Sequence, residues 1–348
     1  MFFALTDDQR DFGAAVRDFL AGKFDLEAVR AVVEDPDGDG HPAALWQAMG
    51  EQGWLAALVP EEYDGLGLGM VDAQVIAREL GAGVAPGPWR GTVLAAEAIR
   101  LAGSKSQQRQ WLPKLAAGEV VGALALRGSD SEADGWPAVE YAQSADLIVA
   151  TDSFGLRLLR SDEVRTRRLD SFDGTTRLAA VTLADGVGEP LPGGTSQVRD
   201  ELAARAAVLI AADLVGGARE ALTRTVAYDR ERKQFGVPVG SFQAIKHTLA
   251  DLHVGVTMAE HAVLYAAHAL DSGGTELDSA AALAVAVAKA KASDTAALVT
   301  AAMIQYHGGI GYTWEHEAHF FYKRAKRLAG TAGTADDQRE RIAELTIG

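Results

Sequence analysis

Two long apolar segments joined by a charged turn constrain the fold of this chain more than any other feature. The first segment runs from about Ala203 to Ala227, and the turn contains Arg230 and Pro238. The second repeats apolar residues at steps of four and three, the spacing of one buried helical face. Ser241 precedes it, and a serine hydroxyl can accept hydrogen bonds from the N–H groups of a first helical turn. We therefore predict two long helices, the second capped by Ser241. The predicted buried face of the second consists of Ile245, Leu249, Leu252, Val256, Ala259 and Val263.

Helical patterns also dominate the start of the chain. Thr6 to Gln9 has the form of a capping box. Pro86 to Pro88 separates two helical patterns, at Ala73 to Leu80 and at Val93 to Leu101, because proline is not tolerated inside a helix. The glycines between Gly65 and Gly69 look like a phosphate-binding loop, but no strand precedes them. We therefore interpret this segment as a loop between helices.

The pattern changes near residue 120. Short apolar or alternating runs, separated by turn residues, are typical of strands. These runs are Val120–Leu126, Leu147–Ala150, Leu156–Leu159 and Arg177–Leu183. The predicted fold is mainly α with a small central β domain: residues 1–119 are helical, 120–198 form a reduced β domain, and 199–348 form a helical bundle.

The composition excludes several classes of function. A net charge of −15 argues against nucleic-acid binding, because phosphates attract a basic surface. The chain contains no cysteine, which excludes disulfides, thiolate metal sites and a cysteine nucleophile. The N-terminus lacks the basic region of a secretory signal, and polar residues interrupt every apolar run before about 18 residues. We expect a cytoplasmic protein with no membrane span.

Two segments carry a family resemblance. Arg232 to Gly236 reads Arg-Lys-Gln-Phe-Gly, and Gly240 to His247 continues Gly-Ser-Phe-Gln-Ala-Ile-Lys-His. Gln305 to His316 reads Gln-Tyr-His-Gly-Gly-Ile-Gly-Tyr-Thr-Trp-Glu-His. Both resemble the C-terminal flavin segments of the acyl-CoA dehydrogenase family, and Val59 to Gly69 resembles a loop of the same family. The resemblance implies an N-terminal α-helical domain, a β-barrel-like middle domain and a C-terminal four-helix bundle.

The resemblance also implies an FAD site shared with a neighbouring chain. The implied cofactor residues are Arg232, Phe235, Gln243, Gln305, His307, Gly308 and Gly309. Arg232 would pair with the pyrophosphate, a role suited to a forked, permanent cation. Glycines 308 and 309 would let the backbone approach the ADP portion closely. The alternative reading of these glycines is an ordinary helix end.

The resemblance weakens in the middle domain. The family places a Thr-Glu segment and a Gly-Ser-Asp segment beside the flavin ring. Here Leu124 to Asp130 keeps Gly128-Ser129-Asp130 but lacks the Thr-Glu, and no aromatic-Ile-Thr strand follows. The Gly-Ser-Asp segment could equally be a plain turn. A ring site built from this chain would lack several of its usual donors.

Both positions that the family uses for its catalytic base are occupied by alanine. The family keeps a glutamate either in a C-terminal loop, here Ala332, or on the helix before the Arg-Lys-Gln-Phe-Gly turn, here near Ala206. Removal of an α-proton requires a positioned base. Asp213, in an apolar helical run, and Glu315, beside His316, are weak substitutes. We therefore expect no complete catalytic site on this chain.

The sequence favours a base-less subunit of a heterotetrameric acyl-CoA dehydrogenase. A homologous partner would supply the base, and the substrate would be an acyl-CoA, by resemblance a steroid side-chain thioester. An electron-transfer flavoprotein would accept the electrons. Two alternatives stay open: an active homotetramer with a displaced base, and a related flavin-dependent oxygenase. His307, His316 and His319 do not have the spacing of a closed metal site, so we predict none.

Overall fold

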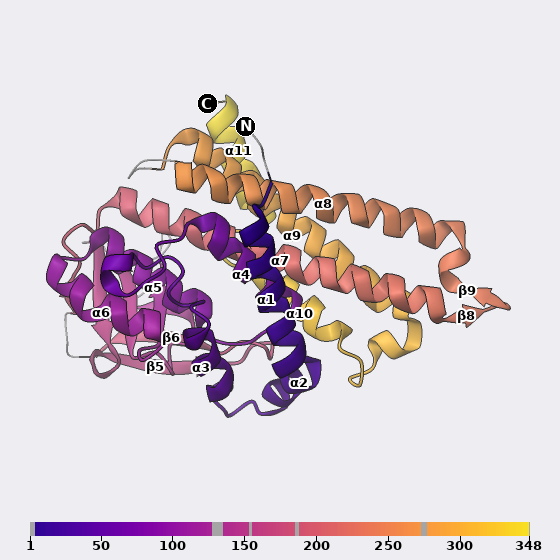
Figure 1. Cartoon of the computed structure of the whole chain (residues 1–348), viewed down its shortest axis with the longest axis horizontal. Helices are drawn as coiled ribbons and strands as arrows, with labels where there is room; N and C mark the ends of the chain where they lie inside the picture. Colours follow the sequence, from indigo (N-terminus) through magenta and orange to yellow (C-terminus); the bar gives the residue numbers. More distant parts are fainter. Residues whose placement is uncertain (1–3, 127–134, 153–154, 185–187, 273–276, 348) are drawn as a thin grey trace.

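The computed structural model describes residues 4–126, 135–152, 155–184, 188–272 and 277–347. The molecule is elongated: the N-terminal helices and the sheets occupy one end, and a helical bundle extends to the other (Figure 1). The predicted fold class, mainly α with a small central β region, is confirmed. No helix in the described part of the chain is long and apolar enough to cross a membrane.

The N-terminal third is helical, as predicted. Its helices are α1 (Asp7–Lys23), α2 (Leu26–Glu34), α3 (Ala43–Glu51), α4 (Met70–Ala82), α5 (Trp89–Ala102) and α6 (Lys105–Ala117). The capping box of Thr6 and Gln9 is present at the start of α1. Pro88 is the residue before α5, so the predicted break is also correct. Glu61–Tyr63 forms a single 3₁₀ turn, and no strand precedes the glycines that follow it.

Two small sheets make up the middle region. The strands are β1 (Gly122–Ala125), β2 (Trp136–Glu140), β3 (Leu147–Asp152), β4 (Gly155–Arg160), β5 (Val164–Leu169), β6 (Leu178–Leu183) and β7 (Glu189–Pro190). One sheet has the order β1-β3-β4-β7, in which β1 and β3 are parallel, and the other has the antiparallel order β2-β6-β5. Buried Ile148, Leu159 and Val181 pack together in a core shared by the two sheets.

The sequence analysis found four of these strands and missed β2, β5 and β7. Strand β2 contains a proline, and β5 carries three arginines, at 165, 167 and 168. Neither strand has the alternation of apolar and polar residues that indicates a half-buried strand. Strand β7 is only two residues long. Pairing with β6 and β4 forms these strands despite their weak local preference.

The C-terminal bundle is built from α7 (Ser196–Glu231), α8 (Gln243–Ser272), α9 (Ser279–His307) and α10 (Ala318–Gly330). The short α11 (Ala335–Ile347) follows and packs on α9. The predicted face of α8 lies inward: Val256, Ala259 and Val263 are buried, whereas Leu249 and Leu252 are half-buried and contact the same core.

Glycines allow α4 and α7 to cross closely. A Cβ atom added to Gly216 would lie 1.8 Å from the carbonyl oxygen of Arg78, and one added to Gly81 would lie 2.1 Å from that of Asp213. Such distances exclude any side chain unless the helices separate. The glycine inside the apolar run of α7 is therefore required by helix packing, and the crossing fixes Asp213 against the N-terminal helices.

Candidate cofactor and substrate sites

The hairpin tip, residues 232–243, projects from the far end of α7 and α8 (Figure 1). It contains the two-residue strands β8 (Lys233–Gln234) and β9 (Val237–Pro238), which pair with each other, and the 3₁₀ turn Val239–Ser241. Phe235 has a left-handed backbone (φ 53°), and 92% of its surface is exposed. Arg232 and Gln243 are exposed too, and their side chains have no polar partner in the described part of the chain.

The end of α9 lies beside the start of this tip. The His307 ring stacks on Tyr228, the fourth-last residue of α7, with ring centroids 4.4 Å apart. Gln305, Gly308 and Gly309 are exposed there, and a Cβ atom added to either glycine would meet nothing within 4 Å. The structure therefore gathers both predicted flavin segments at one open end of the bundle.

His307 itself faces inward. It is buried, and its Nδ1 lies 2.7 Å from the carbonyl oxygen of Met303. Because a carbonyl can only accept, Nδ1 carries the proton. The ring of His316 also lies 4.4 Å away. Burial, followed by the nearby His316, lowers the pKa of His307. In this chain the His307 ring therefore contacts Met303, Tyr228 and His316 in the interior rather than solvent.

The prediction that Ser241 caps α8 was wrong. Helix α8 begins two residues later, at Gln243. The Ser241 hydroxyl instead donates to the carbonyl of Pro238, at 2.6 Å, and thereby closes the 3₁₀ turn. This turn places Gln243 at the first position of α8, on the same exposed end as Arg232.

The loop that contains Ala332 is held by hydrogen bonds from a buried lysine, and the Ala332 side chain is exposed. Ala332 is exposed and has φ 55°. Lys289, fully buried on α9, donates to the carbonyls of Ala329 and Gly333 at 3.1 and 2.9 Å and to Ser293 at 3.1 Å. Burial lowers the pKa of Lys289 to about 8. The loop geometry is therefore held by a buried amine, while its central position carries no acid.

The second base position, Ala206, is buried in α7 beside a group of paired charges. Arg205 lies 2.7 Å from a carboxylate oxygen of Glu201 and 3.1 Å from one of Glu97 on α5. Arg100 also binds Glu97, at 2.7 Å. Glu201 and Glu97 are paired with arginines, so neither carboxylate is free to act as a base.

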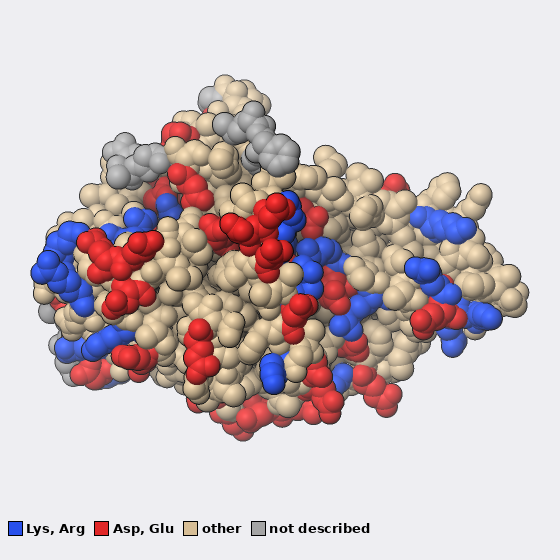
Figure 2. Space-filling model, viewed as in Figure 1, with Lys and Arg blue, Asp and Glu red and all other residues tan. Residues whose placement is uncertain are grey.

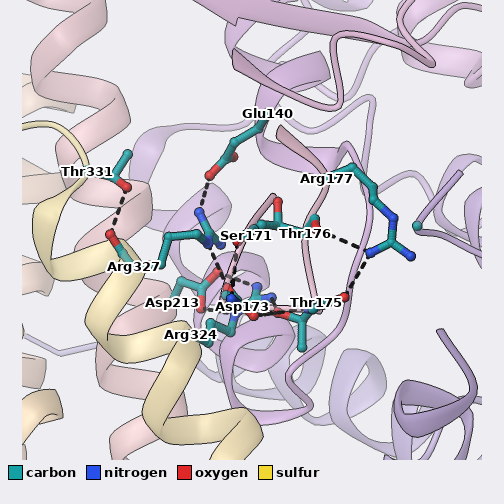
Figure 3. Close-up of polar contacts among 12 residues, drawn as sticks. Glu140, Ser171, Asp173, Thr175, Thr176, Arg177, Asp213, Arg324, Arg327 and Thr331 are labelled. Atoms are coloured by element: carbon teal, nitrogen blue, oxygen red, sulfur yellow. Dashed lines mark hydrogen bonds and ion pairs between the residues drawn. The ribbon is translucent and has the colours of Figure 1, made fainter. Parts of the chain in front are cut away.

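The central ion cluster, shown in part in Figure 3, lies where α5, α7 and α10 meet the sheets. Its charged members are Arg90, Glu140, Asp173, Asp213, Arg324 and Arg327, three of each sign, contributed by α5, β2, the β5–β6 loop, α7 and α10. Arg324 binds both oxygens of Asp213, at 2.8 and 2.6 Å. Arg327 binds Asp173 at 2.6 Å and also Glu140. Arg90 binds Glu140 at 2.8 and 2.7 Å.

The pKa values of four members of this cluster are shifted in the direction that favours their charged forms. Burial opposes ionisation of Glu140, but the charges of Arg90 and Arg327 outweigh it and lower the pKa of Glu140 to about 2. Burial is likewise outweighed at Asp173, whose pKa is lowered chiefly by Arg327. The same pairs raise the pKa of Arg324 and of Arg327 despite their burial. Glu140 and Asp173 are stabilised as anions, which is the opposite of a base whose pKa is raised towards neutrality.

The cluster leaves almost no room. The cavity lined by Trp89, Arg90, Asp213 and Arg324 measures about 20 Å³, the space of roughly one water molecule. Ligand pockets usually measure about 300–1,000 Å³. The region where α5, α7, α10 and the sheets meet is therefore filled by charged side chains.

The two substitute bases lie in different surroundings. Asp213 is buried, and both of its oxygens accept from Arg324, with Arg90 at 3.3 Å. Glu315 is exposed at the edge of a separate cavity of about 880 Å³, between α1, α2 and α7, and its backbone carbonyl accepts from Arg30. Asp213 lines the cavity of about 20 Å³ and Glu315 lines the one of about 880 Å³, and neither Ala206 nor Ala332 lines either of these two cavities.

The Gly128-Ser129-Asp130 segment lies outside the described residues. Sequence reasoning singled out Asp213 as unusual but missed its partners Arg90 and Arg324, and it missed Arg327, which binds the neighbouring Glu140 and Asp173. Arg324 and Arg327 are one helical turn apart, and both are buried in α10 by their pairing. An arginine pair on an apolar helical face is a weak sequence signal, and it does not reveal which acids it meets.

The two helical regions of the chain match models of a known protein family. The family model described as "Acyl-CoA dehydrogenase, N-terminal domain" matches residues 6–119, and "Acyl-CoA dehydrogenase, C-terminal domain" matches residues 193–346. Acyl-CoA dehydrogenase IpdE2 of Mycolicibacterium smegmatis is 37% identical over 319 residues, which cover 91% of each protein.

Solved structures share the fold over the whole chain. A variant of the Tcur3481-Tcur3483 steroid ACAD has a TM-score of 0.86 at 26% identity and covers 98% of both chains. The ChsE4-ChsE5 complex from Mycobacterium tuberculosis contains a chain with a TM-score of 0.88 at 24% identity, covering 99% of this chain and 98% of that one. Both names denote two-component proteins.

Proposed function

This chain belongs to the acyl-CoA dehydrogenase family, and we propose that it is the base-less subunit of a hetero-oligomeric acyl-CoA dehydrogenase. FAD is the cofactor of this family. In the proposed assembly this chain contributes residues to the nucleotide half of an FAD whose ring, base and acyl pocket belong to a homologous partner.

The observation that carries the proposal is the central ion cluster. Ala206 and Ala332 supply no carboxylate, and the region where α5, α7 and α10 meet the sheets is filled by three arginine–carboxylate pairs around a cavity of about 20 Å³. A bound acyl thioester would have to displace buried, mutually neutralised charges, and breaking such a pair is costly. The proposal therefore assigns no acyl pocket to this chain.

The open end of the bundle fits the nucleotide half of FAD. Arg232 is an exposed, unpaired guanidinium in the described chain, suited to two parallel hydrogen bonds with a pyrophosphate. Phe235 presents an exposed ring for stacking, and the exposed amides of Gln243 and Gln305 have no polar partner among the described residues. Glycines 308 and 309 have open space beyond their Cα atoms. When bound, FAD would accept a hydride from the substrate, and this chain's residues would hold and orient its phosphates.

The proposed reaction is the α,β-dehydrogenation of an acyl-CoA thioester at the partner's site, with an electron-transfer flavoprotein as the electron acceptor. A steroid side-chain thioester is the proposed substrate class, supported by the likeness to the steroid ACAD. An active homotetramer would require Asp213 or Glu315 as the base. The pairing of Asp213 with two arginines and the exposure of Glu315 do not favour this alternative.

The deciding experiment measures flavin content and mass of this chain purified alone and co-expressed with a homologous dehydrogenase subunit. We expect a colourless chain alone and a yellow mixed complex with about half a flavin per chain. A yellow homo-oligomer with one flavin per chain would overturn the proposal.

A matched pair of variants tests the role of the tip in the mixed complex. Arg232→Gln should release flavin, measured by absorbance after gel filtration, because it removes the pyrophosphate cation. Arg230→Gln is the control: Arg230 is an exposed arginine two residues away that the proposal leaves without a role. Equal flavin retention in both variants would contradict the assignment of Arg232.

A further inference from the structure

Tyr228 connects the two segments that carry the predicted flavin residues. It is the fourth-last residue of α7, and its backbone carbonyl accepts a hydrogen bond from the N–H of Arg232 at 2.8 Å. Its ring stacks on that of His307, with the two ring planes 24° apart. His307 ends α9 and directly precedes Gly308. One tyrosine therefore reaches from the helix before the hairpin tip to the segment that contains the glycines.

The His307 ring is enclosed by further contacts. Its Nδ1 lies 2.7 Å from the carbonyl oxygen of Met303, and the centroid of the His316 ring lies 4.4 Å from its own. A Cβ atom added to Gly311 would lie 3.0 Å from the Cβ of His307, so the backbone also packs closely there. With Tyr228 stacked against it, the ring has little freedom to turn. Because Gly308 follows His307 in the chain, the backbone that leaves α9 starts from a fixed orientation.

Tyr228 makes this contact with its ring and not with its hydroxyl. The side chain is half-buried, and the hydroxyl forms no hydrogen bond with any residue that the structure describes. A pair of aromatic rings contributes stability beyond the area that it buries. Phenylalanine should therefore be able to replace this tyrosine, whereas leucine should not.

We propose that Tyr228 is a positioning residue of the flavin site and that it acts through His307. This role rests on the proposed function, in which Arg232 binds the pyrophosphate and the glycines approach the ADP portion. Those two groups lie at the ends of different helices, and both are exposed. Figure 2 shows Lys and Arg side chains gathered at this end of the molecule, where an anionic cofactor would bind. The stack holds the two helix ends in one relative position, so FAD does not have to order them when it binds.

The test measures the dissociation constant of FAD in the mixed complex, by fluorescence titration of the flavin-depleted protein. Tyr228→Leu should weaken FAD binding about three- to tenfold, because it removes an aromatic pair and frees the glycine segment. Tyr228→Phe should bind FAD like the wild type, because it keeps the ring. Tyr322→Leu is the matched control and should also bind like the wild type: Tyr322 is a half-buried tyrosine on α10 that the proposal leaves without a role.

A double-mutant cycle with His307→Leu distinguishes positioning from direct contact. If Tyr228 acts through His307, the double variant should bind FAD about as weakly as His307→Leu alone. Losses that add in the double variant would overturn the proposal, because Tyr228 would then contact the cofactor by itself. A Tyr228→Phe complex as weak as Tyr228→Leu would overturn it too, since the effect would belong to the hydroxyl.

Urea denaturation of each mixed complex separates positioning from packing. A tyrosine with a merely structural role would lower the urea midpoint in Tyr228→Leu and leave the FAD dissociation constant of the folded complex unchanged. That result would also overturn the proposal.

The outcome separates this role from the proposed function. If Arg232→Gln releases flavin and Tyr228→Leu binds it like the wild type, the positioning role fails and the flavin role of the tip stands. If both variants bind flavin like the wild type, the flavin role of the tip fails as well.

Discussion

The central ion cluster and the hairpin tip are both rich in charged and polar side chains, but they differ in where those side chains find partners. In the cluster, each arginine binds a carboxylate of the same chain, and the group is buried where three parts of the chain meet (Figure 3). At the tip, the side chains of Arg232 and Gln243 are exposed and have no polar partner among the described residues.

This difference separates a structural use of charge from a binding use. Saturated, buried pairs hold the domains together but leave no group free for a ligand. Unpaired, exposed groups contribute little to the stability of the isolated chain. They are free to bind a ligand, which in the proposed assembly is the FAD held mainly by the homologous subunit. Substitutions in the two regions should therefore affect different measurements.

The largest effect is expected from Arg324→Met, which leaves Asp213 buried without its main counter-charge. Removing one partner of a buried pair costs about 3–5 kcal/mol of unfolding free energy. Arg341→Met is the control, because Arg341 pairs with Glu344 on the exposed surface of α11, and such pairs contribute about 0–1 kcal/mol. Urea denaturation of both variants measures the difference. Similar losses for the two would contradict the structural role of the cluster.

The second-largest effect is expected from acid, which should remove the contribution of Glu140 to the free energy of unfolding. The pKa of Glu140 is lowered from its ordinary value of 4.5 to about 2, so its pairing stabilises the fold fully above about pH 5 and is lost as the pH falls towards 2. The shift corresponds to about 3 kcal/mol. Denaturation at pH 5 and pH 3 should show a steep loss in the wild type and a smaller one in Glu140→Gln. An equal pH dependence in the two proteins would show that Glu140 is not the titrating group.

Asp229, under the tip, should respond to pH in the opposite sense. It is 1% exposed, and neither of its carboxylate oxygens has a hydrogen-bond partner among the described residues. Burial raises its pKa from 3.8 to about 6. The folded state therefore binds the proton more tightly, and stability should rise by about 1.4 kcal/mol as the pH falls from 7.5 to 5.

Asp229→Asn keeps the shape of the side chain and removes its titration, so the variant should lack this rise. Denaturation at pH 7.5, 6 and 5 measures it, and a rise that persists in Asp229→Asn would assign it to another group. Together these two carboxylates predict a stability maximum near pH 5, because Asp229 lowers stability above this pH and protonation of Glu140 lowers it below.

The sequence predicted the tip better than the cluster, for a physical reason. The tip is local: Arg232 to Gln243 is one continuous segment, and its helices follow from apolar spacing. The cluster is not, because Arg327 and Glu140 are 187 residues apart, and Arg324 and Asp213 are 111 apart. No spacing rule pairs charges over such distances. The prediction for Ser241 was wrong for a different reason. A serine hydroxyl can either cap a following helix or bond to a nearby backbone carbonyl, and here it donates to the carbonyl of Pro238.

The smallest effect on stability is expected at the tip itself. Phe235→Ala removes a ring that is 92% exposed and keeps a side chain at φ 53°, so the backbone strain is unchanged. The unfolding free energy should stay within about 0.5 kcal/mol of the wild type. The flavin content of the mixed complex should nevertheless fall, because stacking on an aromatic ring contributes about 1–3 kcal/mol per base.

Val287→Ala, an exposed apolar position on α9 away from the tip, should change neither quantity. A Phe235→Ala complex that retains full flavin would place the adenine elsewhere, and a loss of stability above about 1 kcal/mol would show that the tip also packs within its own chain.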